Sequence, residues 1–295
     1  MKKIVLLLCL IALSIINLPA QKVEINSCFS VDTGYINVDG GILFYEAAGS
    51  GENIVLVHDG LIHHHIWDNQ FQMLANNYHV IRYDRRGYGK SSIPQDNFSN
   101  VDDLNKLFEQ LKIDKAIIFG MSAGGGLTID FTLKYPEKVN AIVLVGSVVS
   151  GLGFTDHMFT RGGHLDPSLS PYNDLHKWLM YFAKDDPYEI YYENSEAKEK
   201  IVKYIEDNEP GVLARLKYTL PPERPAVKNL SEIKIPTLIL TGEFDIPGVH
   251  VHAGAIEAGI ANSKRFIIPK SGHLIPLEQP EIFNETVLNF LKLNL

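Results

Sequence analysis

The sequence predicts an α/β fold, in which a mostly parallel sheet of eight strands has helices on both faces and a helical cap inserted after the sixth strand. Short apolar runs alternate with amphipathic segments over most of the chain, which is typical of parallel strands joined by crossover helices. The alternation stops between about residues 147 and 230 and then resumes. Such an insertion is expected to cover the carboxyl edge of the sheet, where open α/β sheets bind ligands.

The N-terminal segment is predicted to be separate from this fold. Met1-Lys2-Lys3 is a basic start, an apolar run follows from Ile4, and Leu18-Pro19-Ala20 ends it. This is the layout of a secretory signal peptide, and the run is short for a membrane span. We expect cleavage after Ala20 and an exported protein, periplasmic or secreted, without stable membrane insertion; an uncleaved anchor is the alternative. Cleavage would leave Cys28 as the only cysteine, so no intramolecular disulfide is expected.

The first strands and helices follow in order. Residues 34–46 are predicted to form a hairpin that turns at Asp39-Gly40. Residues 54–57, 78–83 and 115–119 are short apolar runs, as expected of buried strands. Two helices between these strands are marked by apolar residues at helical spacing: Trp67, Phe71 and Leu74 in one, and Val101, Leu104, Leu107, Phe108 and Leu111 in the other.

The rest of the sheet lies on either side of the predicted cap. A helix over residues 127–135 stops at Pro136, and residues 139–145 form the sixth strand. The two last strands and a final helix are predicted at residues 237–240, 265–268 and 282–293.

The predicted cap is rich in Tyr, Trp, His, Pro and charged residues, with helical pieces at residues 174–183 and 194–205. We therefore expect a signal peptide at residues 1–20 and a core built from residues 21–146 and 231–295, with the cap at residues 147–230.

Composition excludes some functions. An apolar content of 45% and a charged content of 21% are typical of folded globular proteins. The formal net charge of −8 argues against a nucleic-acid partner or an anionic membrane surface. The sequence makes no prediction of oligomeric state.

One motif carries a strong chemical prediction. Gly120-Met121-Ser122-Ala123-Gly124 lies between a predicted strand and a predicted helix. In a strand–turn–helix context, the serine of a G-x-S-x-G pattern projects from a strained turn as a nucleophile. The glycines allow the two backbones to pass closely, and the N-terminus of the helix faces developing negative charge. Ser122 is the predicted nucleophile, and a plain glycine-rich turn is the alternative.

Two late loops contain the groups that a serine nucleophile needs. His273 follows the last strand, and an imidazole there can remove and return a proton because its pKa lies near neutrality. Asp245 follows the preceding strand and is expected to orient His273, with Glu243 as a nearby competitor for that role.

Four signatures together resemble the α/β-hydrolase fold enzymes of the capped, single-domain type, such as carboxylesterases, haloperoxidase-like perhydrolases, enol-lactonases and proline iminopeptidases. The resemblance covers nearly the whole chain from about Gly34. The signatures are Val57-His58-Asp59-Gly60, Tyr83-Asp84-Arg85-Arg86-Gly87-Tyr88-Gly89-Lys90-Ser91, the turn at Ser122, and the late loops Thr241-Gly242-Glu243-Phe244-Asp245 and Ser271-Gly272-His273-Leu274.

The resemblance implies a catalytic triad and an oxyanion hole. The chain order Ser122, Asp245, His273 is the order of this fold, and family position favours Asp245 over Glu243. The oxyanion hole is expected from the backbone amides of Ala123 and Gly60, with Leu61 as the alternative to Gly60. Asp59 departs from the family pattern, because a glycine usually stands at that position.

Other polar clusters are predicted to be structural. His58 is expected to be structural, and Asp84-Arg85-Arg86 to form a turn with internal ion pairs and glycine-permitted angles, with anion binding as the alternative. For His63-His64-His65, adjacent residues on a helix point in different directions, so no shared metal ion is expected. Leu61, His65 and Trp178 are the predicted substrate contacts.

The predicted function is a serine hydrolase that cleaves a carboxylic ester or lactone of a small to medium substrate, without metal or organic cofactor. Three alternatives stay open: a proline iminopeptidase-like aminopeptidase, which would use Asp185, Asp186, Glu189 and Glu193 to bind an ammonium group, another chemistry on the same triad such as acyl transfer or carbon–carbon cleavage, and a non-catalytic ligand receptor.

Overall fold

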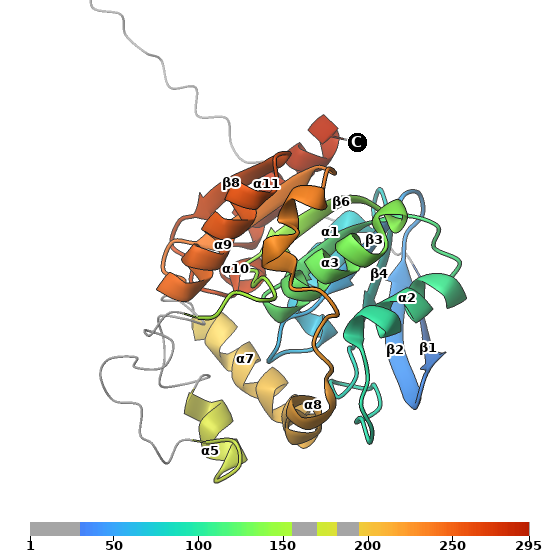
Figure 1. The fold of residues 1–295 in the computed structure, drawn as a ribbon, viewed down its shortest axis with the longest axis vertical. Coiled ribbons are helices and arrows are strands. Elements are labelled where there is room, and N and C mark those ends of the chain that lie inside the picture. The colour runs from blue at the N-terminus through green and yellow to red at the C-terminus, as the bar shows by residue number, and fades with distance from the viewer. Residues whose placement is uncertain (1–29, 155–169, 182–194, 295) are drawn as a thin grey trace, which may run out of the picture.

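A computed structural model describes residues 30–154, 170–181 and 195–294. Its centre is one eight-stranded sheet in the order β1-β2-β4-β3-β5-β6-β7-β8 (Figure 1). Strand β2 is antiparallel to both of its neighbours, and all other pairs are parallel. The predicted mostly parallel α/β sheet is confirmed. The strands are β1 (Asp32–Val38), β2 (Gly41–Ala48), β3 (Asn53–Val57), β4 (His79–Tyr83), β5 (Ala116–Met121), β6 (Val139–Val145), β7 (Thr237–Gly242) and β8 (Ser263–Ile268).

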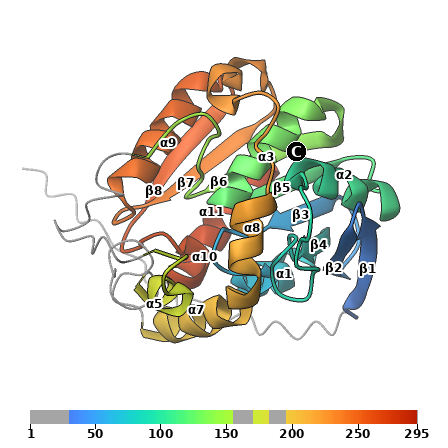
Figure 2. The same ribbon diagram turned by 60° about the horizontal axis from the view of Figure 1, so that its bottom comes forward.

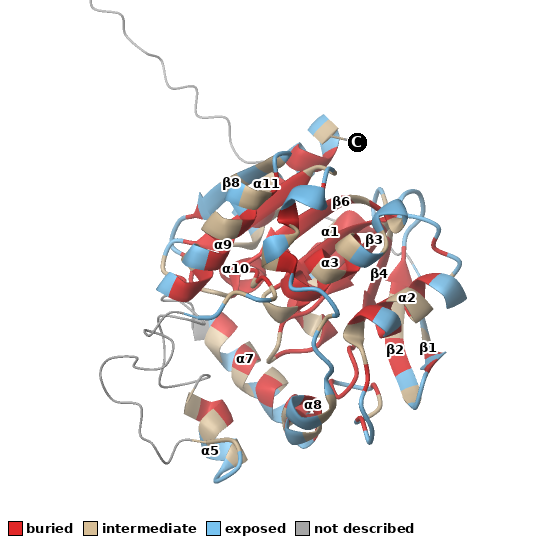
Figure 3. Cartoon of the chain, in the orientation of Figure 1, coloured by how far each residue is buried: buried red, intermediate tan, exposed pale blue. Residues whose placement is uncertain are grey.

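Helices cover both faces of the sheet and create two hydrophobic cores (Figures 1 and 3). The helices are α1 (Asp68–Leu74), α2 (Asn100–Gln110), α3 (Ala123–Lys134), α9 (Pro247–Gly259), α10 (Ile275–Glu278) and α11 (Pro280–Asn294), with a 3-10 turn η1 (His64–Trp67) before α1. Side chains of α1 and α11 pack in one core, and those of α2, α3 and α9 in the other.

Strand β3 shows why the sequence pattern produces this layering. Ile54 and Leu56 face the first core, whereas Val55 and Val57 face the second, and all four are fully buried. Successive side chains of a strand point to opposite faces, so a continuous apolar run is what a strand covered on both faces requires.

The chain between β6 and β7 contributes the helices α5 (Leu175–Met180), α7 (Ser195–Asn208) and α8 (Val212–Tyr218). They lie together at one side of the molecule, in the region predicted to be a cap (Figures 1 and 2). The limits of the cap and of the core segments stay predictions. The predicted signal peptide and Cys28 lie outside the described residues, as do the four acidic residues at positions 185, 186, 189 and 193. Among the described helices, none is long and apolar enough to cross a membrane.

Candidate active site

Ser122 occupies a strained turn between β5 and α3. Its φ of 52° and ψ of −117° belong to a backbone region that residues other than glycine rarely adopt. Its amide donates to the carbonyl of Val145 over 2.8 Å, which ties the turn to the end of β6. A Cβ on Gly124 would lie 2.2 Å from the carbonyl oxygen of His58, and one on Gly120 would lie 2.5 Å from the carbonyl oxygen of Gly124. The glycines are therefore required by the close approach of the backbones.

His273 and Asp245 form a direct pair. Nδ1 of His273 lies 2.9 Å from Oδ2 of Asp245 and 3.1 Å from Oδ1, and the Asp245 side chain is fully buried. Oδ1 of Asp245 also accepts the amide of Ile246, which fixes the carboxylate. Glu243 is exposed, and its Oε2 accepts the amide of Lys270 over 3.0 Å. The carboxylate beside the imidazole is thus that of Asp245.

Gly146, the residue after β6, brings this pair next to the turn at Ser122. The amide of Ser122 is bonded to Val145, the immediate neighbour of Gly146. A Cβ on Gly146, whose φ is 51°, would lie 3.0 Å from Nδ1 of His273 and 3.3 Å from Oδ2 of Asp245. The loops after β5, β7 and β8 therefore meet around the end of β6.

Asp59 shapes the loop after β3. Its Oδ1 accepts the amides of Leu61 at 2.7 Å and Ile62 at 2.6 Å. The amide of Leu61 is therefore engaged. The amides of Gly60 and Ala123, in contrast, donate no hydrogen bond within the described part of the chain. A Cβ on Gly60 would lie 3.4 Å from that of Ala123, so these two residues are close neighbours. Asp59 thus replaces the usual glycine by a side chain that holds the loop.

A pocket of about 310 Å³ opens beside these amides. Gly60, Leu61, Ala123 and Trp178 all line it, so four of the predicted site residues share one space. The remaining lining residues are Arg85, Arg86, Tyr88, Phe98, Asn100, Leu179, Val212, Arg215, Leu216 and Thr219. His65 does not line this pocket; it lines a second one with His63 and His64.

The described lining of the 310 Å³ pocket carries three arginines and no carboxylate. Arg86 is neutralised, because its guanidinium forms two hydrogen bonds with Asp103, at 2.6 and 3.0 Å. Anion binding was the alternative interpretation of the segment with Arg85 and Arg86. No signal in the sequence linked Arg215 to this pocket, since it lies far from the other two in the chain.

Arg85 and Arg215 are buried, and no described carboxylate lies within ion-pair distance of either. Arg85 donates to the carbonyl of Asp59, and its Nε has no partner in the described residues. Arg215 donates to the carbonyl of Gly87 and stacks over the Tyr88 ring at 3.7 Å. Burial lowers the pKa of Arg215, which reflects the cost of a cation without a counter-ion.

His58 is structural, as predicted. Its Nε2 accepts the amide of Arg85 and its Nδ1–H donates to the carbonyl of Asp59, each over 2.9 Å. Burial and the charge of Arg85 hold the pKa of His58 well below its usual value, so the ring is neutral.

The turn that follows β4 departs from the prediction in one respect. Gly87 and Gly89 have φ values of 81° and 46°, as expected of glycine-permitted angles. The predicted internal ion pairs are wrong, because Asp84 bonds His64 and Arg86 bonds Asp103. The charged residues of the turn therefore fasten it to neighbouring elements.

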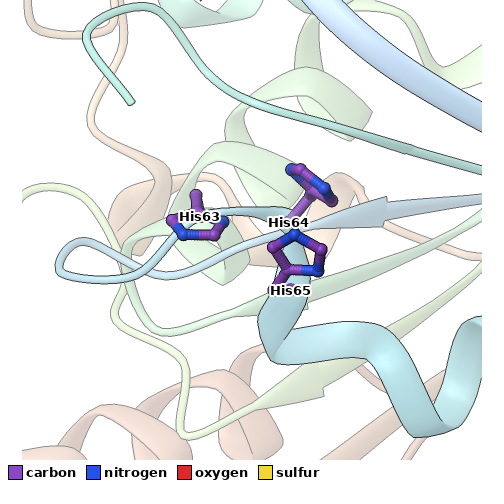
Figure 4. A group of neighbouring side chains, drawn as sticks. All are labelled: His63, His64 and His65. Carbon is purple, nitrogen blue, oxygen red and sulfur yellow. The ribbon is translucent and has the colours of Figure 1, made fainter. Parts of the chain in front are cut away.

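The histidine cluster also corrects an expectation. His63 has extended backbone and only His64 and His65 belong to η1, so the predicted helical divergence of three side chains does not occur. One ring nitrogen from each residue lies within 4.8 Å of the others, and the three rings gather at the start of η1 (Figure 4). Burial lowers the pKa of His63 to about 4.

Comparison with known proteins agrees with the fold. The α/β hydrolase fold family matches residues 53–161. A 2-hydroxy-6-oxononadienedioate/2-hydroxy-6-oxononatrienedioate hydrolase of Klebsiella pneumoniae is 30% identical over 288 residues, which cover 87% of this chain and 94% of that protein. A bromoperoxidase from Bacillus anthracis superimposes with a TM-score of 0.73 at 27% identity, over 89% of this chain and 100% of that one. The chain therefore belongs to the α/β hydrolase fold family and is an enzyme of the hydrolase class.

Proposed function

We propose that the protein is a serine hydrolase that cleaves a carboxylic ester or lactone through Ser122, His273 and Asp245. The observation that carries this proposal is the His273–Asp245 pair, which lies against Gly146 beside the strained turn of Ser122. A strained serine next to an imidazole that a buried carboxylate orients is the arrangement that acyl transfer to serine requires.

The proposed reaction has two halves. His273 removes the proton of the Ser122 hydroxyl as the oxygen attacks the acyl carbonyl, and Asp245 stabilises the imidazolium that forms. The imidazolium then protonates the leaving alcohol, and an acyl-enzyme remains on Ser122. Water, deprotonated by the same imidazole, attacks the acyl-enzyme and releases the acid.

Gly60 and Ala123 are proposed as the oxyanion hole. Both amides lack a hydrogen-bond partner in the described residues, and the two residues are close neighbours at the pocket. Two free amides that converge at the N-terminus of a helix stabilise a developing oxyanion. Leu61 is a poorer donor, because its amide already bonds Asp59.

The charge of the pocket favours substrates with an acidic group. Its described lining has two buried arginines without a counter-ion and no carboxylate, which suits a carboxylate on the substrate and repels an ammonium group. An aminopeptidase would need negative charge in the pocket to bind the ammonium group of its substrate. A non-catalytic ligand receptor, the other open alternative, would need neither the strained serine nor the oriented imidazole.

The two buried arginines of the pocket also favour a second candidate function, hydrolysis of an oxo dicarboxylate. The Klebsiella pneumoniae relative is named for a 6-oxo dioate substrate. A ketone carries no alkoxy leaving group, so hydrolysis at such a carbonyl breaks a carbon–carbon bond. Arg85 and Arg215 would then hold a substrate carboxylate beside the oxyanion hole.

A fluorophosphonate probe and a substrate panel test both candidates. We expect stoichiometric labelling of wild-type protein and none of the Ser122→Ala variant. The panel compares aryl esters, lactones, a prolyl amide and a 2-hydroxy-6-oxo dienedioate, each with and without a terminal carboxylate where the chemistry allows. Ester turnover above dienedioate turnover supports the first function, and the reverse supports the second. Turnover of the prolyl amide alone, or absence of labelling, would reject both.

Export through residues 1–20 is proposed on the sequence pattern alone. Mass spectrometry of protein expressed from the full sequence checks it. A mature N-terminus at Gln21 in the exported fraction is the expected result, and full-length protein retained in the cell would contradict it.

A further inference from the structure

The second pocket, of about 460 Å³, has three adjacent histidines in its wall. His63 and His64 are buried, with 5% and 2% of their surface exposed, and His65 is half-buried. One ring nitrogen of each lies within 4.8 Å of the others. The proposed hydrolase mechanism uses none of the three.

Each imidazole has a carboxylate near at least one of its nitrogens, and His64 has one near both, because its Nε2 lies 3.8 Å from Oε1 of Glu46. Nδ1 of His64 lies 2.6 Å from Oδ1 of Asp84, and Nδ1 of His65 lies 2.9 Å from Oδ1 of Asp68. Nε2 of His63 lies 3.7 Å from Oδ2 of Asp207. A carboxylate on the distal nitrogen is the usual second shell of a metal-binding histidine, because it fixes the tautomer and makes the free nitrogen more basic.

Two ring nitrogens of the cluster are buried without a hydrogen bond. Nδ1 of His63 and Nε2 of His64 have no hydrogen bond within the described residues. Few buried polar atoms of folded proteins lack a hydrogen bond, and a bound ion is one of the causes when they do.

We propose that His63, His64 and His65 bind a divalent transition-metal ion of the zinc class in this pocket. Three neutral imidazoles are a donor set that Zn²⁺ and its neighbours prefer over Mg²⁺ or Ca²⁺. Zn²⁺–nitrogen bonds of about 2.0–2.1 Å place tetrahedral ligands about 3.4 Å apart, so the cluster must contract when the ion binds. His65 would supply this movement, since its side chain is the most exposed of the three, at 37%.

The charge of the pocket supports a cation. Its wall contains the carboxylates of Asp68, Asp84 and Asp207 and the ammonium groups of Lys90 and Lys203, so acidic groups exceed basic ones. Arg82, which also contacts Asp68, is balanced by Glu46 at 2.6 Å. A fourth position of the ion would be left to water, as in sites with three protein ligands.

The site is tested on the full-length chain, without an affinity tag and after treatment with a chelator. Zn²⁺ binding is measured by equilibrium dialysis with metal analysis, and Co²⁺ binding by visible absorption. We expect one ion per chain, with at least about tenfold weaker binding in His65→Gln and in His63→Phe, which keeps an aromatic ring against Tyr204. Asp68→Asn should weaken binding by roughly 10–100-fold without removing a ligand.

His176→Gln is the matched control, because this histidine is exposed in α5 and also pairs with a carboxylate, that of Glu209. Its Zn²⁺ affinity should equal that of the wild type. Absence of stoichiometric binding, or equal affinity in His65→Gln and the wild type, would overturn the proposal. If circular dichroism shows that His63→Phe does not fold, His65→Gln decides alone, because the side chain of His65 is half-buried whereas that of His63 is buried.

Discussion

The imidazole of His273 is paired with Asp245: its Nδ1 lies 2.9 Å from Oδ2 of that residue, and the Asp245 side chain is fully buried. In the proposed mechanism this contact orients the ring so that Nε2 accepts the serine proton. Replacement of Asp245 by Asn keeps the shape but removes the acceptor that selects this tautomer. We expect Asp245→Asn to lower kcat for an ester substrate by about 10³–10⁴-fold with little change in Tm.

Glu243→Gln is the matched control for Asp245→Asn. Its carboxylate is exposed and bonds the amide of Lys270, a contact that the side-chain oxygen of Gln preserves. Its kcat should stay within about twofold of the wild type. A large loss in Glu243→Gln together with full activity in Asp245→Asn would transfer the orienting role to Glu243.

The strained backbone of Ser122 predicts a conflict between activity and stability. At a φ of 52° and ψ of −117°, a residue with Cβ carries strain that glycine does not. Ser122→Gly should therefore raise the free energy of unfolding by ~1 kcal/mol over Ser122→Ala, although both variants are inactive. Urea denaturation measures the difference. Equal stability of the two variants would show that the turn is unstrained in solution.

Gly146 is predicted to be essential for the position of the imidazole. A Cβ there would lie 2.9 Å from Cε1 of His273 at a positive φ, so Gly146→Ala must displace the ring or the loop. Because a misplacement of about 1 Å costs on the order of 10²-fold in rate, we expect at least that loss in kcat and slower labelling by a fluorophosphonate.

Gly153→Ala provides the control for Gly146→Ala. This glycine is exposed, and a Cβ would meet no atom within 4 Å. Its activity should match the wild type. A Gly146→Ala variant that labels as fast as Gly153→Ala would contradict the proposed place of His273 in the site.

Much of the fold was predictable because its sheet is buried on both faces. Strand β6 coincides with the predicted residues 139–145, and α2, α3 and α11 lie where apolar residues recur at helical spacing. Helix α9 was not predicted. Pro247–Gly259 contains three glycines and two valines, which disfavour helix, and the helix forms because Val249, Ala253 and Ile256 are buried against the sheet.

The candidate site was only partly predictable, because only some of its residues belong to a local sequence motif. Ser122 lies in a local motif, and local spacing indicates the turn. The convergence of Arg85 and Arg215 on one pocket depends on how the chain between β6 and β7 packs, and no local pattern encodes that. The divergence of the three histidine side chains was wrongly predicted, because a regular helix was expected from His63, whereas the helix begins one residue later.

Asp130 predicts a dependence of stability on pH. It lies in α3, where burial raises its pKa from 3.8 to about 6, and a hydrogen bond from Ser150 over 2.7 Å only partly opposes this shift. A raised carboxyl pKa means that the folded state binds the proton more tightly than the unfolded state. This contribution to stability is complete below pH 3.8 and is lost as the pH rises through about 6.

The Asp130→Asn variant should therefore be more stable than the wild type at pH 7, and the two should converge near pH 4. Asn stays neutral and still accepts the Ser150 hydroxyl, so the packing is preserved. A shift of about two pKa units sets an upper limit of roughly 3 kcal/mol, and partial solvent access makes the expected gain ~1–2 kcal/mol. Urea denaturation at pH 4, 5, 6 and 7 measures both proteins. Parallel pH profiles for the two proteins would show that Asp130 is ionised in the folded state at no cost, because water solvates its carboxylate in the groove between α3 and residues 220–224.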